Sequence, residues 1–238
     1  MKNIDYSEWF QSSAIARYHR AILAKDFMRD YAPTVWPPEE RIGFCFEFPS
    51  RPGCQVKTGW QQHIHLQRYI EYSDDVRLQA ESLLVKHFGA VTRDYLAIHL
   101  RNDLDWPRAC PGAVGSSWFN FMASYQCHQW NSEFKFTLEM CDPSLETILH
   151  KLKRTLNETG LKKVLIATDK LSHEREIQQM VGADVMVVHP DPWLPVVDTY
   201  LLSNSAYFIG NCVSSFSAFV RRQRDTHNLG STDYFAID

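Results

Sequence analysis

The sequence predicts an α/β protein built on a doubly wound, mostly parallel sheet of the Rossmann type. After Gly89, short apolar runs alternate with segments of helical periodicity, which is the pattern of successive βαβ units. Polar residues or glycines follow these runs, and ligands of such sheets bind beyond the carboxyl ends of the strands. With 238 residues, 45% of them hydrophobic, the chain is long enough to bury one sizeable core.

The first 67 residues differ in pattern from the rest and predict a separate, partial N-terminal domain. Apolar residues recur at helical spacing over Gln11–Tyr31, and Pro33 ends this helix. From Trp36 to Gln67 the sequence is irregular and rich in proline, which indicates a junction. We therefore divide the chain into residues 1–67 and 68–238.

Helices and strands are expected to alternate through residues 68–238. Ser73 is a suitable N-cap for a first helix, and Gly89 is a suitable C-terminal cap. Further helical patterns lie at Leu145–Leu156, around Ile177, at Val197–Leu202 and at Phe216–Arg224. The expected strands are Tyr95–Leu100, Lys163–Thr168, Asp184–His189 and Ala206–Gly210.

Charge and hydropathy exclude two classes of function. The net charge of −3, from 25 basic and 28 acidic residues, leaves no excess of cations to neutralise a polynucleotide, so nucleic acid is not an expected partner. No stretch approaches the ~20 apolar residues that cross a bilayer, so we expect no membrane span. The first residues also show no basic segment followed by an apolar one, as a signal peptide would.

The six cysteines favour disulfides over a metal site. They contain no CxxC pair and no cysteine and histidine spacing typical of zinc, so no metal is expected. An even number at wide spacing fits three bridges in an oxidising compartment, although six buried free thiols would give the same pattern. The cysteines are Cys45, Cys54, Cys110, Cys127, Cys141 and Cys212.

The end of the first expected strand carries a candidate anion ligand. Arg101 follows that strand, and its planar guanidinium suits a diphosphate at the mouth of the crevice. The alternative is a surface arginine paired with Asp103 or Asp105. Histidines such as His99 are usually satisfied core residues, so His99 is not assigned as a general base.

A second candidate lies where the strand ending at Gly210 turns into a helix that starts near Ser214. Backbone N–H groups at such a helix start, together with the hydroxyls of Ser214 and Ser215, form an anion site. The alternative is an ordinary serine N-cap.

Two aspartates complete the candidates. Asp198 lies among apolar residues at the start of a helical period, where a carboxylate could accept the paired N–H donors of guanine; a capping role is the alternative. Asp169 also ends a strand, and there we expect it to cap the next helix.

Three passages carry a resemblance to a known family. The run AIHLRNDLDWPRAC resembles the HLR-containing strand of the GDP-fucose protein O-fucosyltransferases that modify EGF-like repeats. The run VDTYLLSNSAYFIGNCVSSFSAFVRRQRD resembles their C-terminal nucleotide-binding stretch, and DFMRDYAPTVWPPEERIGFCFE is similar to a passage in their first half.

The resemblance implies a GT-B architecture and an inverting transfer of fucose from GDP-fucose to Ser or Thr, with no metal or other cofactor, in the lumen of the endoplasmic reticulum. The implied partners are GDP-fucose and EGF-like repeats of secreted or cell-surface proteins such as Notch-type receptors. His99, Leu100 and Arg101 would line the donor pocket, and Arg101 would neutralise the departing β-phosphate. Asp198 would hold guanine, and Ser214, Ser215 and Phe216 would hold the diphosphate and fucose.

The family also implies disulfides that pair Cys45 with Cys54, Cys110 with Cys141, and Cys127 with Cys212. Independently of the family, Asn157-Glu158-Thr159 is a sequon that can accept a glycan in the lumen.

The sequence departs from the family in its first part and at its end. It shows no RFGNQ-type loop, it is shorter between Cys54 and Gln67 than the relatives, and it stops before a KDEL-like tail. Residues 1–67 are therefore expected to be a remnant of the acceptor-side domain, with residues 68–238 as the GDP-fucose-binding domain. The chain alone is expected to transfer no fucose; a non-catalytic GDP-fucose binder or a folding helper for EGF-like repeats is the alternative.

Overall fold

The computed structural model describes residues 67, 70–103, 106–112, 114, 123, 125–128 and 135–237. These residues form a five-stranded sheet of order β3-β2-β1-β4-β5 in which every neighbouring pair is parallel. The expected helix at 11–31 and the expected pair of Cys45 with Cys54 lie outside the described residues. The strands are β1 (Leu96–Leu100), β2 (Lys163–Thr168), β3 (Met186–Val188), β4 (Tyr207–Gly210) and β5 (Ser231–Tyr234).

Five longer helices connect or flank the strands. They are α6 (Asp74–Phe88), α10 (Leu145–Thr159), α11 (Glu174–Val181), α12 (Pro195–Ser203) and α13 (Ser215–His227). Short helical turns lie between β1 and α10: α7 (Trp106–Ala109), the 3-10 turn η1 (Cys110–Gly112), α8 (Tyr125–His128) and α9 (Leu138–Cys141). The order of strands and long helices confirms the α/β prediction.

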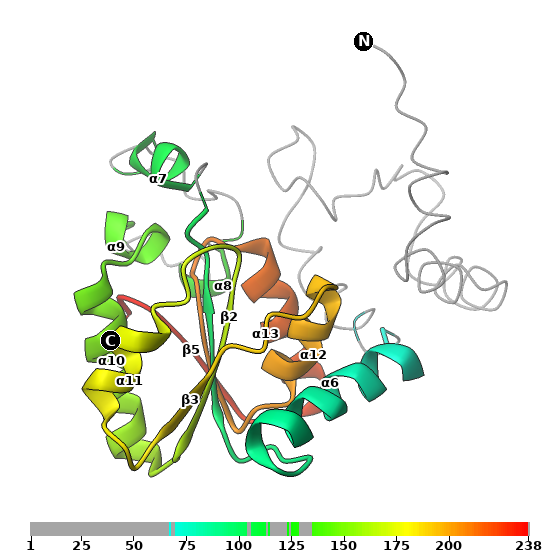
Figure 1. The fold of residues 1–238 in the computed structure, drawn as a ribbon. Helices are drawn as coiled ribbons and strands as arrows, with labels where there is room; N and C mark the ends of the chain where they lie inside the picture. The colour runs from blue at the N-terminus through cyan, green and yellow to red at the C-terminus, as the bar shows by residue number, and fades with distance from the viewer. Residues whose placement is uncertain are drawn as a thin grey trace, which may run out of the picture.

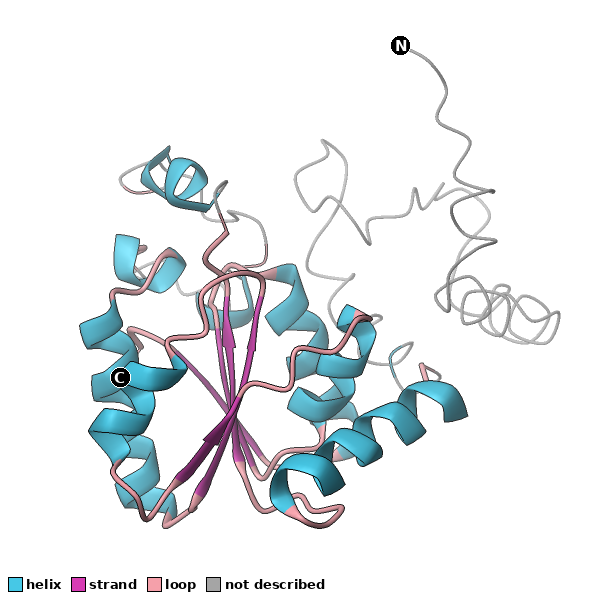
Figure 2. Cartoon of the chain, viewed as in Figure 1, coloured by secondary structure: helices cyan, strands magenta, loops and turns pink. Residues whose placement is uncertain are grey.

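The helices form one layer on each face of the sheet, as Figure 1 and Figure 2 show. Successive strand residues point to opposite faces, so β1 divides its apolar side chains between two cores. Tyr95 and Ala97 pack with α6, α12 and α13, whereas Leu96, Ile98 and Leu100 pack with α10 and α11. Because helices cover both faces of the sheet, residues on both sides of each strand are buried, and the strands are continuous apolar runs in the sequence.

Local capping fixes the ends of the helices that flank β1 and β2. The hydroxyl of Ser73 accepts a hydrogen bond from the backbone N–H of Val76, and Gly89 ends α6 in the left-handed region at φ 78°. Gly160 ends α10 in the same way at φ 70°. The positions predicted for the start and end of α6 are therefore confirmed.

The last strand, β5, was not predicted, because its residues Ser231–Tyr234 are mostly polar. Tertiary contacts hold it instead. The buried guanidinium of Arg224 in α13 donates to the carbonyl oxygens of Ser205 (2.7 Å) and Ser231 (2.8 Å) on the two sides of the β4–β5 edge. The Lys151 ammonium of α10 lies 2.7 Å from Oδ2 of Asp233, which fixes the strand to the other helical layer.

Two disulfides join the described segments, Cys110 to Cys141 and Cys127 to Cys212. They are the pairings that the family resemblance implied for these four cysteines. The second spans 85 residues and ties α8 to the turn that follows β4. Among the described residues, no helix is both long enough and apolar enough to cross a membrane.

Candidate functional site

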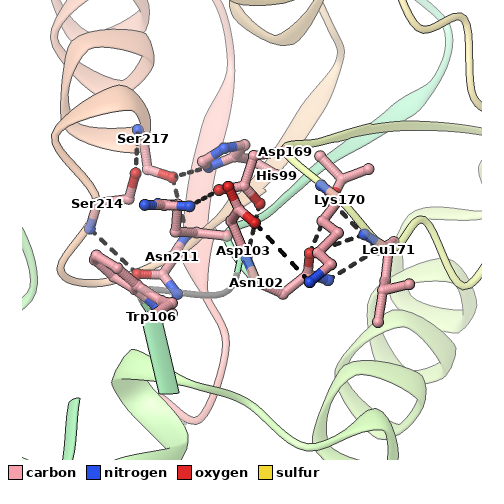
Figure 3. A network of polar contacts seen from close by, with 12 residues as sticks. His99, Asn102, Asp103, Trp106, Asp169, Lys170, Leu171, Asn211, Ser214 and Ser217 are labelled. Carbon is pink, nitrogen blue, oxygen red and sulfur yellow. Dashed lines mark hydrogen bonds and ion pairs between the residues drawn. The ribbon is translucent and has the colours of Figure 1, made fainter. Parts of the chain in front are cut away.

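The candidate site lies where the carboxyl ends of β1 and β4 meet. These strands are neighbours in the sheet, but the chain leaves β1 toward α10 on one face and leaves β4 into α13 on the other. The two connections diverge, and in doubly wound sheets this divergence opens the crevice that binds ligands. Figure 3 shows the polar side chains that gather there.

Arg101 follows β1 directly and is held from two sides. Its guanidinium forms an ion pair with the carboxylate of Asp169, which follows β2, and lies 4.7 Å from the centroid of the Trp106 ring. Its side chain is 22% exposed, so the ion pair does not remove it fully from solvent. Of the two partners that the sequence offered for a surface arginine, Asp105 lies outside the described residues; the described ion pair of Arg101 with Asp169 adds a partner that the sequence did not suggest, in addition to Asp103.

Asn102 fixes the turn after β2 that carries Asp169. Its backbone N–H donates to Oδ1 of Asp169 at 2.8 Å, and its side-chain amide donates to the carbonyl of Leu171 at 2.8 Å and accepts from the Leu171 N–H at 2.9 Å. Figure 3 shows this clamp between the ends of β1 and β2. The expectation that Asp169 caps the next helix is wrong, because His173 occupies the N-cap position of α11 and Asp169 bonds to residues after β1.

His99 is buried and does not act as an accessible base. Its Nδ1 lies 2.8 Å from Oγ of Ser217, and its ring packs against Phe216 with centroids 4.7 Å apart. Burial, with a smaller contribution from the charge of Arg101, lowers the pKa of His99 to about 3. The imidazole therefore stays neutral and joins β1 to the first turn of α13.

The first turn of α13 presents its backbone donors to the same crevice. Ser214 is the N-cap, and the N–H groups of Ser215 and Phe216 follow at the positions that have no partner within a helix. Ser215 is exposed, whereas Ser214 is buried. The positive end of the 13-residue helix thus faces a site beside Arg101, which suits an anion.

Asn211 holds this turn in place through buried hydrogen bonds. Its Oδ1 accepts from the N–H groups of Val213 (3.1 Å) and Ser214 (3.2 Å), and its Nδ2 donates to the carbonyl of Cys141 at 2.7 Å. Gly210 precedes it because a Cβ there would lie only 3.0 Å from both the Phe208 ring and Cβ of Ser217.

Gln126 of α8 braces the turn from the other side. Its Nε2 donates to the carbonyl oxygens of Cys212 (2.7 Å) and Ser214 (3.2 Å), next to the disulfide of Cys127 with Cys212. The hydroxyl of Tyr234 in β5 donates to Oε1 of Gln126 at 2.9 Å. Segments about 85 residues apart in sequence thus fix the same short turn.

Asp198 lies in the first part of α12, which begins at the carboxyl edge after β3. Its Oδ1 is screened from water and has no hydrogen-bond partner among the described residues. Burial and then the charge of Asp191 raise the pKa of Asp198 to about 7. A carboxylate oxygen that has no partner among the described residues is suited to accept an N–H donor from a ligand.

The structure brings most of the residues expected from sequence to one edge of the sheet: His99, Arg101, Asp198, Ser214, Ser215 and Phe216. Leu100 differs, because its side chain is in the core on the face of α10 and α11, and only its backbone reaches this edge. Sequence reasoning missed Asn102, Asn211 and Gln126. The first two lie within two residues of a strand end and could have been found there, whereas no local pattern marks Gln126.

This geometry can bind a nucleoside diphosphate. A fixed guanidinium and a helix N-terminus provide positive charge for two phosphates, and a carboxylate with an unpartnered oxygen provides an acceptor for a base with adjacent N–H donors. The positively charged groups are held by neighbouring side chains, so little rearrangement is needed on binding.

Comparisons with known proteins agree with this assignment. Residues 53–227 match the family described as GDP-fucose protein O-fucosyltransferase. Over 94% of its length the chain is 24% identical to "GDP-fucose protein O-fucosyltransferase 1" of Caenorhabditis elegans, 75% of which is covered. That alignment runs over 294 positions, more than the 238 residues of this chain, so the relative has internal stretches without a counterpart here.

Solved structures of POFUT1 share the fold. The complex with GDP is 28% identical with a TM-score of 0.64, and the complex with GDP-fucose is 27% identical with a TM-score of 0.65. They match 73% and 74% of this chain, but only 50% and 49% of their own chains are covered. The chain therefore spans about half the length of these solved structures.

Proposed function

The chain belongs to the GDP-fucose protein O-fucosyltransferase family, and from this membership we propose that it binds GDP-fucose at the crevice between β1 and β4. The observation that carries the proposal is that the end of β1 meets the first turn of α13, since His99, two residues before Arg101, contacts Ser217 and Phe216. Asp198 begins α12 at the same edge of the sheet. Arg101 and the N–H groups of α13 would hold the diphosphate, and Asp198 would accept from guanine.

The reaction that this site would support is inverting transfer of fucose to a Ser or Thr hydroxyl of an EGF-like repeat. The bond between fucose and the β-phosphate oxygen breaks while the hydroxyl oxygen attacks the same carbon from the opposite side. Negative charge then develops on the β-phosphate, where Arg101 is placed to neutralise it without metal or cofactor. His99 would support the donor pocket by holding Ser217 and Phe216 of α13 against β1.

The acceptor hydroxyl must also lose a proton, and we assign that step to none of the described residues beside Arg101, because His99 is buried and the Asp169 carboxylate is engaged in the ion pair with Arg101. We therefore assign only donor binding and leaving-group stabilisation to this part of the chain, and propose that transfer to EGF-like repeats requires further residues opposite the crevice. The lack of an assigned base among the described residues also favours a second candidate, a GDP-fucose binder that does not catalyse transfer.

Calorimetric titration of the chain with GDP and GDP-fucose tests donor binding. We expect both to bind, and Arg101→Ala to weaken GDP binding by on the order of tenfold to a hundredfold, as loss of a charge-assisted pair does. Arg101→Lys should restore only part of the affinity, because an ammonium cannot reproduce the planar fork.

Arg93→Ala is the matched control, because exposed Arg93 precedes β1 and so lies at the opposite edge of the sheet. It removes the same charge without touching the crevice. Equal loss of affinity in the two alanine variants would mean that only net charge matters, and the assignment of Arg101 would be abandoned.

The lumen of the endoplasmic reticulum is the compartment we propose, because the disulfides in the described part of the chain require an oxidising environment. Asn157 of the sequon is exposed in the last turn of α10, at the amino edge of the sheet and thus away from the crevice. A glycosidase-sensitive mass shift after secretory expression, lost in Asn157→Gln, would support this compartment. A chain that enters the lumen without that shift would show that Asn157 is not glycosylated.

A further inference from the structure

We propose that Trp193 forms an aromatic cover for the base of the bound nucleotide and acts with Asp198 to recognise guanine, an inference that rests on the proposed donor site. Trp193 lies in the loop between β3 and α12, and its side chain is 94% exposed. The other large hydrophobic side chains exposed among the described residues reach at most 60%. An indole exposed to this degree offers a flat apolar face and an N–H donor to a ligand.

Trp193 and Asp198 both lie at the start of α12, about one helical turn apart. Leu194 is the N-cap of α12, so Trp193 is the residue before the cap and Asp198 is the fourth residue of the helix. In many helices the residues at these two positions are both apolar and pack on one another. The Trp193 side chain, 94% exposed, does not pack in this way here. Here the fourth residue is a carboxylate, so the indole has no apolar partner at that position.

The loop displays the indole from a restricted backbone. Pro190 and Pro192 precede Trp193 and Pro195 begins α12, and Asp191 between the first two adopts the left-handed region at φ 45°. Proline fixes its own φ and limits the residue before it. The ring is therefore presented at the carboxyl edge of the sheet with little backbone freedom to lose when a ligand binds.

An exposed ring beside an unpartnered carboxylate suits a flat, apolar-faced molecule with N–H donors along one edge. Guanine has both features: its face can stack on an indole, and its ring and exocyclic N–H groups can donate to Asp198. Stacking of a base on an aromatic side chain typically changes affinity by about one to two powers of ten. Trp193 would thus contribute to the binding of the base, while Arg101 and α13 bind the phosphates.

The test compares ligands that contain the base with one that lacks it, by calorimetry on the whole chain. We expect Trp193→Ala to weaken GDP binding by on the order of tenfold, and Trp193→Phe to retain most of the affinity, because a smaller ring still stacks. Binding of inorganic pyrophosphate should not change in either variant. Met186→Ala is the matched control, because its exposed side chain lies at the other end of β3.

Fluorescence gives a second readout. Stacking on the indole should quench tryptophan emission when GDP binds, and the part of the quenching that is absent in Trp193→Phe reports contact with this ring.

Unchanged GDP affinity in Trp193→Ala, or an equal loss for GDP and pyrophosphate, would overturn the inference while leaving the donor site intact. Self-association that disappears in Trp193→Ala without any change in GDP affinity would identify a protein contact instead. Failure of the unsubstituted chain to bind GDP would overturn the proposed donor site itself, and the inference with it.

Discussion

The carboxyl group of Asp198 is held in surroundings that disfavour its charge. Its pKa rises from the ordinary value of 3.8 to about 7, because burial removes water and Asp191 adds a like charge. The folded chain therefore holds this proton more tightly than the unfolded chain. By linkage, the contribution of Asp198 to stability decreases as the pH rises from about 4 to about 7 and is constant above that range.

Asp198→Asn should stabilise the protein near neutral pH and weaken the binding of GDP. The gain in melting temperature should be larger at pH 8 than at pH 5, since the carboxylate is charged in the folded state only at the higher pH. A variant that melts at the same temperature as the unsubstituted chain at both pH values would contradict the raised pKa.

The affinity of the unsubstituted chain for GDP should increase with pH up to about 7, because only the carboxylate can accept both guanine donors. Below the pKa the affinity should fall by up to about tenfold per pH unit. Phosphate groups also titrate near pH 6, so Asp198→Asn, which leaves that titration unchanged, is the control. A pH profile shared by both proteins would assign the dependence to the nucleotide.

At the scale of single elements, the turn between β4 and α13 is the part of the site that depends most on distant support. It is short, and its N–H groups can face a ligand only if the two residues before Ser214 keep their conformation. Asn211 provides this by accepting from Val213 and Ser214 while donating to Cys141. Such a buried amide acts as part of the backbone framework.

Asn211→Ala should therefore reduce the free energy of unfolding by about 2–4 kcal/mol, because it leaves buried N–H groups without acceptors. Urea unfolding measures this change. The same substitution at exposed Asn157 is the control and should change stability by less than about 0.5 kcal/mol. GDP binding measured on the fraction that remains folded should weaken as well, and full affinity in that fraction would show that Asn211 supports stability but not the ligand site.

For the whole molecule, the described residues form a complete five-stranded sheet covered on both faces. The donor crevice, in contrast, is built from one edge of that sheet, and in the proposed reaction the acceptor must approach from the opposite side. Under this proposal, the described residues can fold and bind a nucleotide, and groups outside them complete the transfer.

We expect the chain alone to bind GDP-fucose but to transfer no detectable fucose to a folded EGF-like repeat. Labelled GDP-fucose with a repeat as acceptor measures transfer, and the calorimetric titration on the same preparation shows that the donor site is intact. Replacement of the acceptor Ser or Thr in the repeat by Ala is the control for label that attaches elsewhere. Transfer at the rate of an intact relative would contradict the proposal that transfer requires further residues opposite the crevice.

The sequence by itself determined the α/β class, the order along the chain of β1 to β4 and the long helices, and the residues that follow β1 and β4. Apolar runs, helical periodicity and caps are set by neighbours within one turn or one strand, so Ser73, Gly89, Arg101 and Ser214 could be assigned from local patterns. The resemblance carried by the HLR and GNCVSSF runs also identified the family that the comparisons show.

Only the tertiary structure decided which side chains meet. The pairing of Arg101 with Asp169, the contact of Gln126 with the turn after β4 and the polar strand β5 depend on segments far apart in sequence. Parallel strands bring such segments together through their register, and no residue on either strand encodes its partner locally. The physical reason is that a buried polar group is fixed by the donors and acceptors around it in space, and these become its neighbours only when the chain has folded.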